Sequence, residues 1–183
     1  MRVAIVSDTH GEVDDRIVDE ALRCDFVVHA GDVGTREVLD ALDPGAGRLV
    51  AVRGNNDVRE KWRQSDWELL ESLPWEARLP LPGGEVVIVH GHRYGNPGRS
   101  HERMRHDYPG ARLVVYGHSH RKCADVGTQP WILNPGAAGR VRTFGGPTIC
   151  LLEASAAQWR LDTRQFPPAE TKRAGRSGRS ATV

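Results

Sequence analysis

Five short apolar runs are spread along the first two thirds of the chain. Each run is continuous rather than alternating, and each is rich in β-branched residues. Continuous runs of this length are typical of strands that are covered on both faces. The sequence therefore predicts five buried strands, at residues 3–6, 26–28, 49–52, 86–89 and 113–116.

Two segments between these runs have helical periodicity. Apolar residues recur at spacings of three and four positions over residues 12–22, as on one face of a helix. Residues 35–42 form a second candidate helix, with Thr35 as its N-cap and turn-forming residues at 43–45 after its end. Strand and helix alternate through the first half of the chain, which predicts an α/β fold.

The remaining pattern predicts shorter elements. An amphipathic helix is expected over residues 57–73, where residues 65–68 have capping-box spacing for a helix that runs to Leu73. A short basic helix is expected at 100–108. Residues 75–90 are predicted to form two strands around a turn at 82–84. We expect the second half of the chain to form a second, largely antiparallel sheet. Its further strands are expected at residues 131–133, 148–152 and 158–161.

The composition narrows the class of protein. Hydrophobic residues make up 39% of 183 positions, which is ordinary for one globular domain. Lys plus Arg number 25 and Asp plus Glu number 24, so the formal net charge is +1. This balance argues against a nucleic-acid partner. No apolar run approaches the ~18 residues of a membrane span, so we expect no membrane partner.

The cysteines and the first residues bear on the cellular compartment. Cys24, Cys123 and Cys150 are odd in number and form no CxxC pair, which disfavours a disulfide framework and a cysteine zinc site. Ser7 and Asp8 interrupt the first apolar run, so we expect no targeting signal. These observations predict a reducing, cytoplasmic location. The sequence leaves the oligomeric state open, including a homo-oligomer.

The composition changes after Phe166. Residues 167–183 are rich in Pro, Ala, Gly, Ser and Arg and lack apolar periodicity. Their net charge is +3, because one acidic and four basic residues fall there, which leaves −2 for the preceding 166 residues. We expect one domain over residues 1–166 and a disordered basic tail over residues 167–183. The charged tail residues are Glu170, Lys172, Arg173, Arg176 and Arg179.

Polar side chains follow each of the five predicted strands at its carboxyl end. In open α/β sheets this edge is where ligands bind. Each end carries Asp, Asn or His, often next to Gly, and six of the eight histidines fall in these five stretches. The stretches are residues 7–10, 29–32, 53–57, 90–92 and 117–120.

This mixture of residue types points to metal binding. Neutral imidazoles with carboxylate and amide oxygens suit Mn, Fe, Zn or Ni rather than Ca or Cu(I). The candidate ligands exceed what one ion needs, and a carboxylate shared by two ions gives a binuclear centre with the ions ~3.5–4 Å apart. Two such cations bind phosphate oxygens and lower the pKa of a bridging water, so that hydroxide exists near neutral pH. The natural reaction of such a centre is in-line attack on a phosphate ester.

Five blocks of residues, in this order along the chain, resemble the motifs of the calcineurin-like metallophosphoesterase superfamily: Asp8-x-His10, Gly31-Asp32, Gly54-Asn55-x-Asp57, His90, and Gly117-His118-x-His120. The short length and the segments 90–92 and 116–120 resemble its small bacterial and archaeal phosphodiesterase branch, whose late Asn-Pro-Gly turn is matched at residues 134–136. The resemblance implies a four-layer α/β/β/α sandwich of two mixed sheets, with the metal site at the carboxyl ends of the strands.

The resemblance also implies a role for each candidate ligand. Two divalent ions are implied, with Mn²⁺ expected and Fe, Ni or Zn as alternatives. Asp32 would bridge the two ions. The other ligands would be Asp8, His10 and His120 for the first ion, and Asn55, His90 and His118 for the second.

One position departs from the superfamily pattern. Much of the superfamily has a histidine after the metal-binding Asn, where it can donate a proton to the leaving group, and this chain has Asn56 there. An amide can donate a hydrogen bond but is no general acid near pH 7, so we expect weaker activity on poor leaving groups. The small phosphodiesterase branch also tends to lack this histidine. His92 and water remain as alternative proton donors, and the catalytic candidates are Asp32, Asn56 and His92.

Several neighbours of the motifs are expected to support the site. Thr9 and Asp57 are expected to orient the ligands by hydrogen bonds. His29 is expected to form a structural hydrogen bond, and His101 and His106 to lie on the surface of a helix. Four residues near the motif ends are either solvated or able to bind a phosphate or a base: Arg53, Arg93, Tyr94 and Arg140.

The leading interpretation is a metal-dependent phosphodiesterase. It would hydrolyse a small or nucleotide-like phosphodiester by attack of a metal-bridging hydroxide, and its expected partner is a small-molecule phosphate ester. Two alternatives stay open. The first is a phosphomonoesterase or dinucleoside-polyphosphate hydrolase on the same site, and the second is a non-catalytic metal-binding scaffold.

Overall fold

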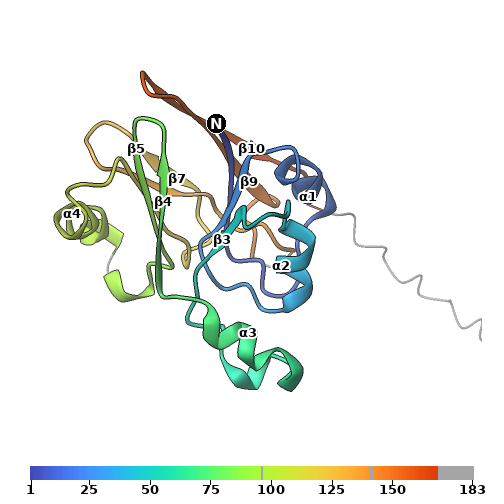
Figure 1. The fold of residues 1–183 in the computed structure, drawn as a ribbon. Helices are drawn as coiled ribbons and strands as arrows, with labels where there is room; N and C mark the ends of the chain where they lie inside the picture. Colours follow the sequence, from blue (N-terminus) through green and yellow to red (C-terminus); the bar gives the residue numbers. More distant parts are fainter. Residues whose placement is uncertain (96, 141, 169–183) are drawn as a thin grey trace, which may run out of the picture.

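The computed structural model describes residues 1–95, 97–140 and 142–168, and its centre consists of two five-stranded sheets (Figure 1). The predicted basic tail, apart from residues 167 and 168, lies outside the described residues. No helix in the described part of the chain is long and apolar enough to cross a membrane.

The first sheet has the strand order β10-β9-β1-β2-β3. Its strands are β1 (Arg2–Val6), β2 (Phe26–His29), β3 (Leu49–Ala51), β9 (Thr148–Ala154) and β10 (Trp159–Gln165). The first three strands are parallel, as the alternation of strand and helix predicts, whereas β9 pairs antiparallel with β1 and β10 with β9. The placement of β9 and β10 corrects our expectation, which put them in the second sheet. A continuous apolar run shows that a strand is buried on both faces but does not show which strand lies beside it.

The second sheet has the strand order β4-β5-β6-β8-β7. It consists of β4 (Glu76–Leu81), β5 (Gly84–Val89), β6 (Leu113–Val115), β7 (Cys123–Asp125) and β8 (Trp131–Asn134). The three central strands are parallel and only the two edge pairs are antiparallel. The expectation of a largely antiparallel sheet was therefore wrong, because the crossover between β5 and β6 contains a helix and returns the chain in the same direction. The sequence analysis also missed β7, a short and largely exposed edge strand.

In the described part of the chain, four α-helices flank the sheets: α1 (Asp15–Ala21), α2 (Arg36–Leu42), α3 (Trp67–Ser72) and α4 (Pro97–Asp107). The expected helix over residues 57–73 is largely wrong. Two 3₁₀ turns, η1 (Arg59–Lys61) and η2 (Gln64–Asp66), precede a helix of only six residues. The expected capping box is absent, because the Ser65 hydroxyl donates to the neighbouring Asp66 carboxylate instead. A third 3₁₀ turn, η3 (His92–Tyr94), follows β5.

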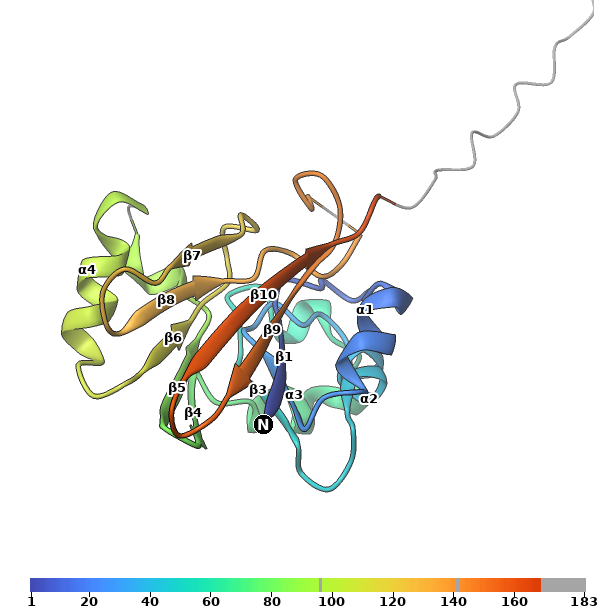
Figure 2. The same cartoon turned by 90° about the horizontal axis from the view of Figure 1, so that it is seen from above.

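Three apolar clusters divide the molecule into four layers, α/β/β/α. The largest cluster fills the space between the two sheets, with Ile5 and Val28 from the first and Ile88 and Val115 from the second. A second cluster packs α1, α2 and α3 on the outer face of the first sheet, and a third packs α4 on the second sheet through Met104. Figure 2 shows these layers from α4 on the left to α1 and α2 on the right. The fold class expected from the sequence is confirmed.

Candidate metal centre

The loops after β1 and β2 are joined side by side at the carboxyl edge of the first sheet. The Asp8 amide donates to the Gly31 carbonyl over 3.0 Å, and the His10 amide donates to the Asp32 carbonyl over 2.9 Å. These bonds extend the parallel pairing of the two strands beyond their ends. Asp8 and His10 of the first loop are thereby held beside Asp32 of the second.

The same edge of the second sheet lies opposite. The Gly117 amide donates to the His90 carbonyl over 3.0 Å, which joins the loops after β5 and β6. The His118 amide then donates to both carboxylate oxygens of Asp8, over 3.0 and 3.1 Å, and so links the two sheets. The carboxyl ends of these four strands therefore meet in one place. The loop after β3 joins them through the Asn56 amide, which donates to Asp32 over 2.8 Å.

Five of the predicted metal ligands have left-handed backbone conformations, with φ between 51° and 70°. Such a conformation costs roughly 1–3 kcal/mol in a residue with a side chain, and it clusters at functional sites. Asp and His tolerate it better than most residues. No pattern in the sequence signals this strain. The five residues are Asp8, His10, Asp32, His118 and His120.

One group of candidate ligand atoms comes from Asp8, His10 and His120. The Nε2 atoms of the two histidines lie 3.0 Å apart, and Nε2 of His120 lies 3.4 Å from Oδ1 of Asp8. Burial and the charge of Arg142 lower the pKa of His120 to about 4. Burial also lowers the pKa of His10. Both rings are therefore neutral at pH 7, which is the form that binds a metal ion.

A second group consists of Asp8, Asp32 and His90. Nδ1 of His90 donates to the Ala30 carbonyl over 2.8 Å, so Nε2 faces the site. This atom lies 3.3 Å from Oδ2 of Asp32 and 3.1 Å from Oδ1 of Asn55. Burial lowers the pKa of His90, but the Asp32 bond and charge outweigh it, so the net shift is upward. The residues around His90 thus favour a positive charge near its Nε2 atom, and a bound divalent cation would supply that charge.

The Asp32 carboxylate lies between the two groups. Its Oδ2 is 3.7 Å from Nε2 of His10 and 3.3 Å from Nε2 of His90. Burial alone would raise its pKa, but hydrogen bonds and charge from His90, together with bonds from Asn56, place the pKa well below its usual range. Asp32 is therefore ionised and reaches both groups. Asp8 also belongs to both.

The Asn56 amide is already engaged with Asp32. Its backbone N–H and Nδ2 donate to the two Asp32 oxygens over 2.8 and 2.7 Å, and its Oδ1 accepts from the Lys61 ammonium. In this arrangement Asn56 orients the carboxylate rather than presenting its amide to a leaving group. This contact was not expected from the sequence.

His118 and His92 lie at the rim of the centre. His118 is exposed, and its ring is edge-on to His90 with 5.4 Å between ring centroids. It joins neither compact ligand group among the described residues. The His92 ring is 5.7 Å from His90 and 6.3 Å from His118, and its buried Nδ1 has no hydrogen-bond partner in the described part of the chain.

Two supporting residues went unnoticed in the sequence analysis. The buried Ser7 hydroxyl donates to Oδ2 of Asp8 over 2.8 Å. Nδ2 of Asn134, in the Asn-Pro-Gly turn, donates to the Gly117 carbonyl over 2.8 Å and to the Ser119 hydroxyl over 3.1 Å. The late turn therefore fixes the loop that carries His118. A single serine carries no sequence signal for this role. The Asn-Pro-Gly turn was recognised only through its resemblance to the phosphodiesterase branch.

The expected supporting residues act mainly on the backbone of the loops. Thr9 and the fully buried His29 form a 2.9 Å hydrogen bond, and burial lowers the pKa of His29 to about 3. Asp57 accepts from the Val33 and Gly54 amides rather than from a ligand side chain. These contacts hold the ligand loops in place.

One other expectation about a neighbouring residue needs correction. His101 is not a free surface residue, because its ring nitrogens lie 3.0 Å from the Asp125 carboxylate and 3.0 Å from the Tyr116 hydroxyl. Arg140 pairs with Glu12, whereas Arg142 lies 3.5 Å from Nε2 of His120. His106 is exposed, as expected.

Metal affinity is expected to fall as the pH falls below 7. Burial raises the pKa of Asp8 to about 7, so an incoming cation must displace a proton from it at lower pH. For one displaced proton, the dissociation constant should rise about tenfold per pH unit below this value. Calorimetric titration with Mn²⁺ from pH 5.5 to 8, in two buffers of different ionisation enthalpy, measures both the affinity and the protons released. An affinity that stays constant over this range would contradict the prediction.

Two mixed sheets with Asp, His and Asn side chains gathered at one edge define an α/β sandwich with a metal-binding site. The model of the calcineurin-like phosphoesterase superfamily domain matches residues 1–157, and the chain belongs to this superfamily. The protein is accordingly a metal-dependent phosphoesterase, as the sequence motifs indicate.

Similar proteins come from bacteria and archaea. The probable metallophosphoesterase YsnB of Bacillus subtilis is 29% identical over 168 residues, covering 88% of this chain and 90% of the relative. Phosphodiesterase MJ0936 of Methanocaldococcus jannaschii is 24% identical over 172 residues, covering 87% and 97%.

Solved structures show the same fold. A crystal structure of Vps29 from Entamoeba histolytica complexed with zinc superposes with a TM-score of 0.69 at 17% identity, covering 91% of this chain and 99% of that one. A structure described as that of a novel archaeal phosphodiesterase gives a TM-score of 0.64 at 22% identity, covering 90% and 100%. These similarities support the two-sheet architecture.

Proposed function

We propose that this chain is a metal-dependent phosphodiesterase that hydrolyses a small or nucleotide-like phosphodiester. The observation that carries the proposal is the ionised Asp32 carboxylate between two groups of candidate ligands. Such an arrangement suits two divalent ions that share one carboxylate. The name of the archaeal relative MJ0936, a phosphodiesterase, favours diesters over monoesters.

The residues present fit two divalent ions, with Mn²⁺ expected. Imidazole nitrogens with carboxylate and amide oxygens are the donors that such an ion prefers. When bound, the ions would supply a hydroxide nucleophile near neutral pH and offset the charge of the phosphate. Asp32 would be shared by both ions. The first would also take Asp8, His10 and His120, and the second Asn55, His90 and His118.

The remaining chemistry falls to side chains of this chain. Asn56 holds the Asp32 carboxylate in one orientation through two hydrogen bonds. Burial and the charges of His90 and Arg93 lower the pKa of His92, so this ring is neutral at pH 7. A neutral imidazole donates one hydrogen bond to a leaving oxygen but is a poor general acid. Substrates with good leaving groups should therefore react fastest.

A comparison of aryl phosphates tests the proposal. The metal-loaded protein is assayed with bis(p-nitrophenyl) phosphate and p-nitrophenyl phosphate in Mn²⁺, Ni²⁺, Zn²⁺ or Mg²⁺, with chelator-treated protein as the control. We expect the diester to react faster and the activity to disappear on chelation. A faster monoester would favour the phosphomonoesterase alternative. Bound metal without hydrolysis of either ester would favour the scaffold alternative.

A further inference from the structure

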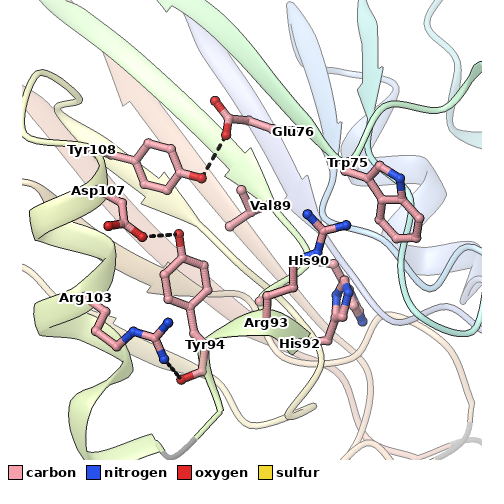
Figure 3. Close-up of a pocket in the computed structure, with 11 residues that line it drawn as sticks. Trp75, Glu76, Val89, His90, His92, Arg93, Tyr94, Arg103, Asp107 and Tyr108 are labelled. Atoms are coloured by element: carbon pink, nitrogen blue, oxygen red, sulfur yellow. Dashed lines mark hydrogen bonds between the residues drawn. The ribbon is translucent and has the colours of Figure 1, made fainter.

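A pocket of about 240 Å³ opens beside two histidines of the metal centre, His90 and His92 (Figure 3). At this end it is lined by Trp75 and Arg93. At the other end, the Tyr94 and Tyr108 hydroxyls donate to the carboxylates of Asp107 and Glu76. The pocket therefore has basic side chains near the metal ligands, whereas its far end holds two carboxylates together with Arg103.

Two arginines contact one tryptophan at the basic end. The guanidinium carbons of Arg53 and Arg93 each lie 5.0 Å from the centroid of the Trp75 ring. Arg53 follows β3, Trp75 precedes β4, and Arg93 lies in η3 after β5. Three segments that are distant in the sequence thus bring two positive charges to one aromatic side chain, which attracts them through its ring quadrupole. We call this group the Arg-Trp-Arg cluster.

Neither arginine of this cluster has a carboxylate within ion-pair distance among the residues that the structure describes. Arg59 also contacts a tryptophan, Trp67, but it pairs with Glu71 as well. Arg53 is positioned by a 2.8 Å hydrogen bond from its Nε to the Asp57 carbonyl. A guanidinium group without a paired carboxylate offers its charge and its N–H donors to an anion.

One imidazole separates the cluster from the metal ligands. The Trp75 and His92 ring centroids are 5.7 Å apart, and those of His92 and His90 are also 5.7 Å apart. An anion at the cluster therefore lies beside the reacting phosphate rather than in its place. A second charged group on the same substrate molecule can therefore reach the cluster.

We propose that the Arg-Trp-Arg cluster is a specificity subsite for a second phosphate group on the substrate, with Arg93 as its main contact. This inference rests on the proposed phosphodiesterase function and names a substrate class for it. The favoured substrates are phosphodiesters whose organic group carries a further phosphate, as in a nucleotide phosphorylated at a second position. Guanidinium groups match phosphate oxygens in geometry and charge.

Two matched substrates test the subsite. Thymidine 5′-(p-nitrophenyl phosphate) is compared with the same compound carrying a 3′-phosphate, using the metal-loaded full chain and the variants Arg93→Gln and Arg93→Lys. For Arg93→Gln we expect KM for the 3′-phosphorylated compound to rise about tenfold or more, as for the loss of a charged hydrogen bond. KM for the other compound should change less than twofold, so the ratio of the two KM values is the readout. Arg93→Lys should restore part of the discrimination.

The matched control variant is Arg59→Gln. It removes a guanidinium that contacts Trp67 outside the pocket. It should leave both KM values unchanged. An equal change for the two compounds in Arg93→Gln, or no change for either, would overturn the proposal.

Binding measurements separate this proposal from the proposed activity. Calorimetry compares thymidine 3′,5′-bisphosphate with thymidine 5′-monophosphate on the metal-loaded wild-type protein and on Arg93→Gln. Tighter binding of the bisphosphate that is lost in Arg93→Gln supports the subsite even if no diester is hydrolysed. Equal binding of both nucleotides to the wild type overturns the subsite even if diesters are hydrolysed.

Discussion

Replacing Asp32 by asparagine should reduce kcat/KM for an aryl phosphodiester by about 10³-fold or more, because bound ions supply several kcal/mol of transition-state stabilisation. The substitution keeps the size of the side chain and removes the negative charge between the two ligand groups. Metal content, measured by mass spectrometry after gel filtration, should fall together with activity.

A surface carboxylate provides the control for this variant. Asp40 is exposed and, among the residues that the structure describes, pairs only with Arg36 one helical turn away, so Asp40→Asn should keep full activity and metal content. Thermal unfolding of both variants checks that each is folded. An Asp32→Asn protein that retains wild-type metal content and activity would rule out a ligand role for this carboxylate.

Replacing Gly117 by alanine should damage the site without changing any ligand. A Cβ atom at this position would lie 1.9 Å from the Ser7 hydroxyl oxygen and 2.7 Å from Oδ2 of Asp8. Overpacking of this kind typically costs about 1–3 kcal/mol, which corresponds to a fall in Tm of roughly 2–12 °C at this chain length. Because Asp8 must move, metal affinity should also fall by about 10–100-fold, as when a group that orients a ligand is lost.

Gly127→Ala is the matched control for this second variant. A Cβ atom at Gly127 would meet no atom within 4 Å. The control should therefore keep the Tm of the wild type, measured by thermal unfolding. It should also keep the metal affinity of the wild type, measured by calorimetric titration with Mn²⁺. If Gly117→Ala also binds Mn²⁺ with unchanged affinity, the close packing of Gly117 on Asp8 does not position that ligand.

Local sequence patterns predicted the buried parallel strands well and the sheet partners poorly. The run at 3–6 reads directly as β1, whereas the run at 148–152 became the neighbour of β1 rather than a strand of the second sheet. A run of apolar residues records burial, which is a local property. The neighbour of a strand in the sheet depends on the path of the long connections between strands. A short sequence pattern does not encode that path.

The metal centre likewise has features that the sequence predicted and features that it did not. The residue types and the spacing of the blocks indicated metal binding, since Asp8, His10 and Asp32 follow strands that must end at one edge. The contact between Asn56 and Asp32 was not predictable, because it depends on the side-chain orientation after β3.

The sequence by itself determined the alternation of strands and helices and the chemical character of the centre, because strand periodicity and ligand chemistry are written in local residue order. The family and its four layers followed from the resemblance of the motifs. Only the tertiary structure showed that Asp8 belongs to both ligand groups, that five of the ligands have left-handed backbone conformations, and that Arg53 and Arg93 both contact Trp75. Those features depend on distances between loops that are far apart along the chain. Such distances are set by how the two sheets pack on their shared core.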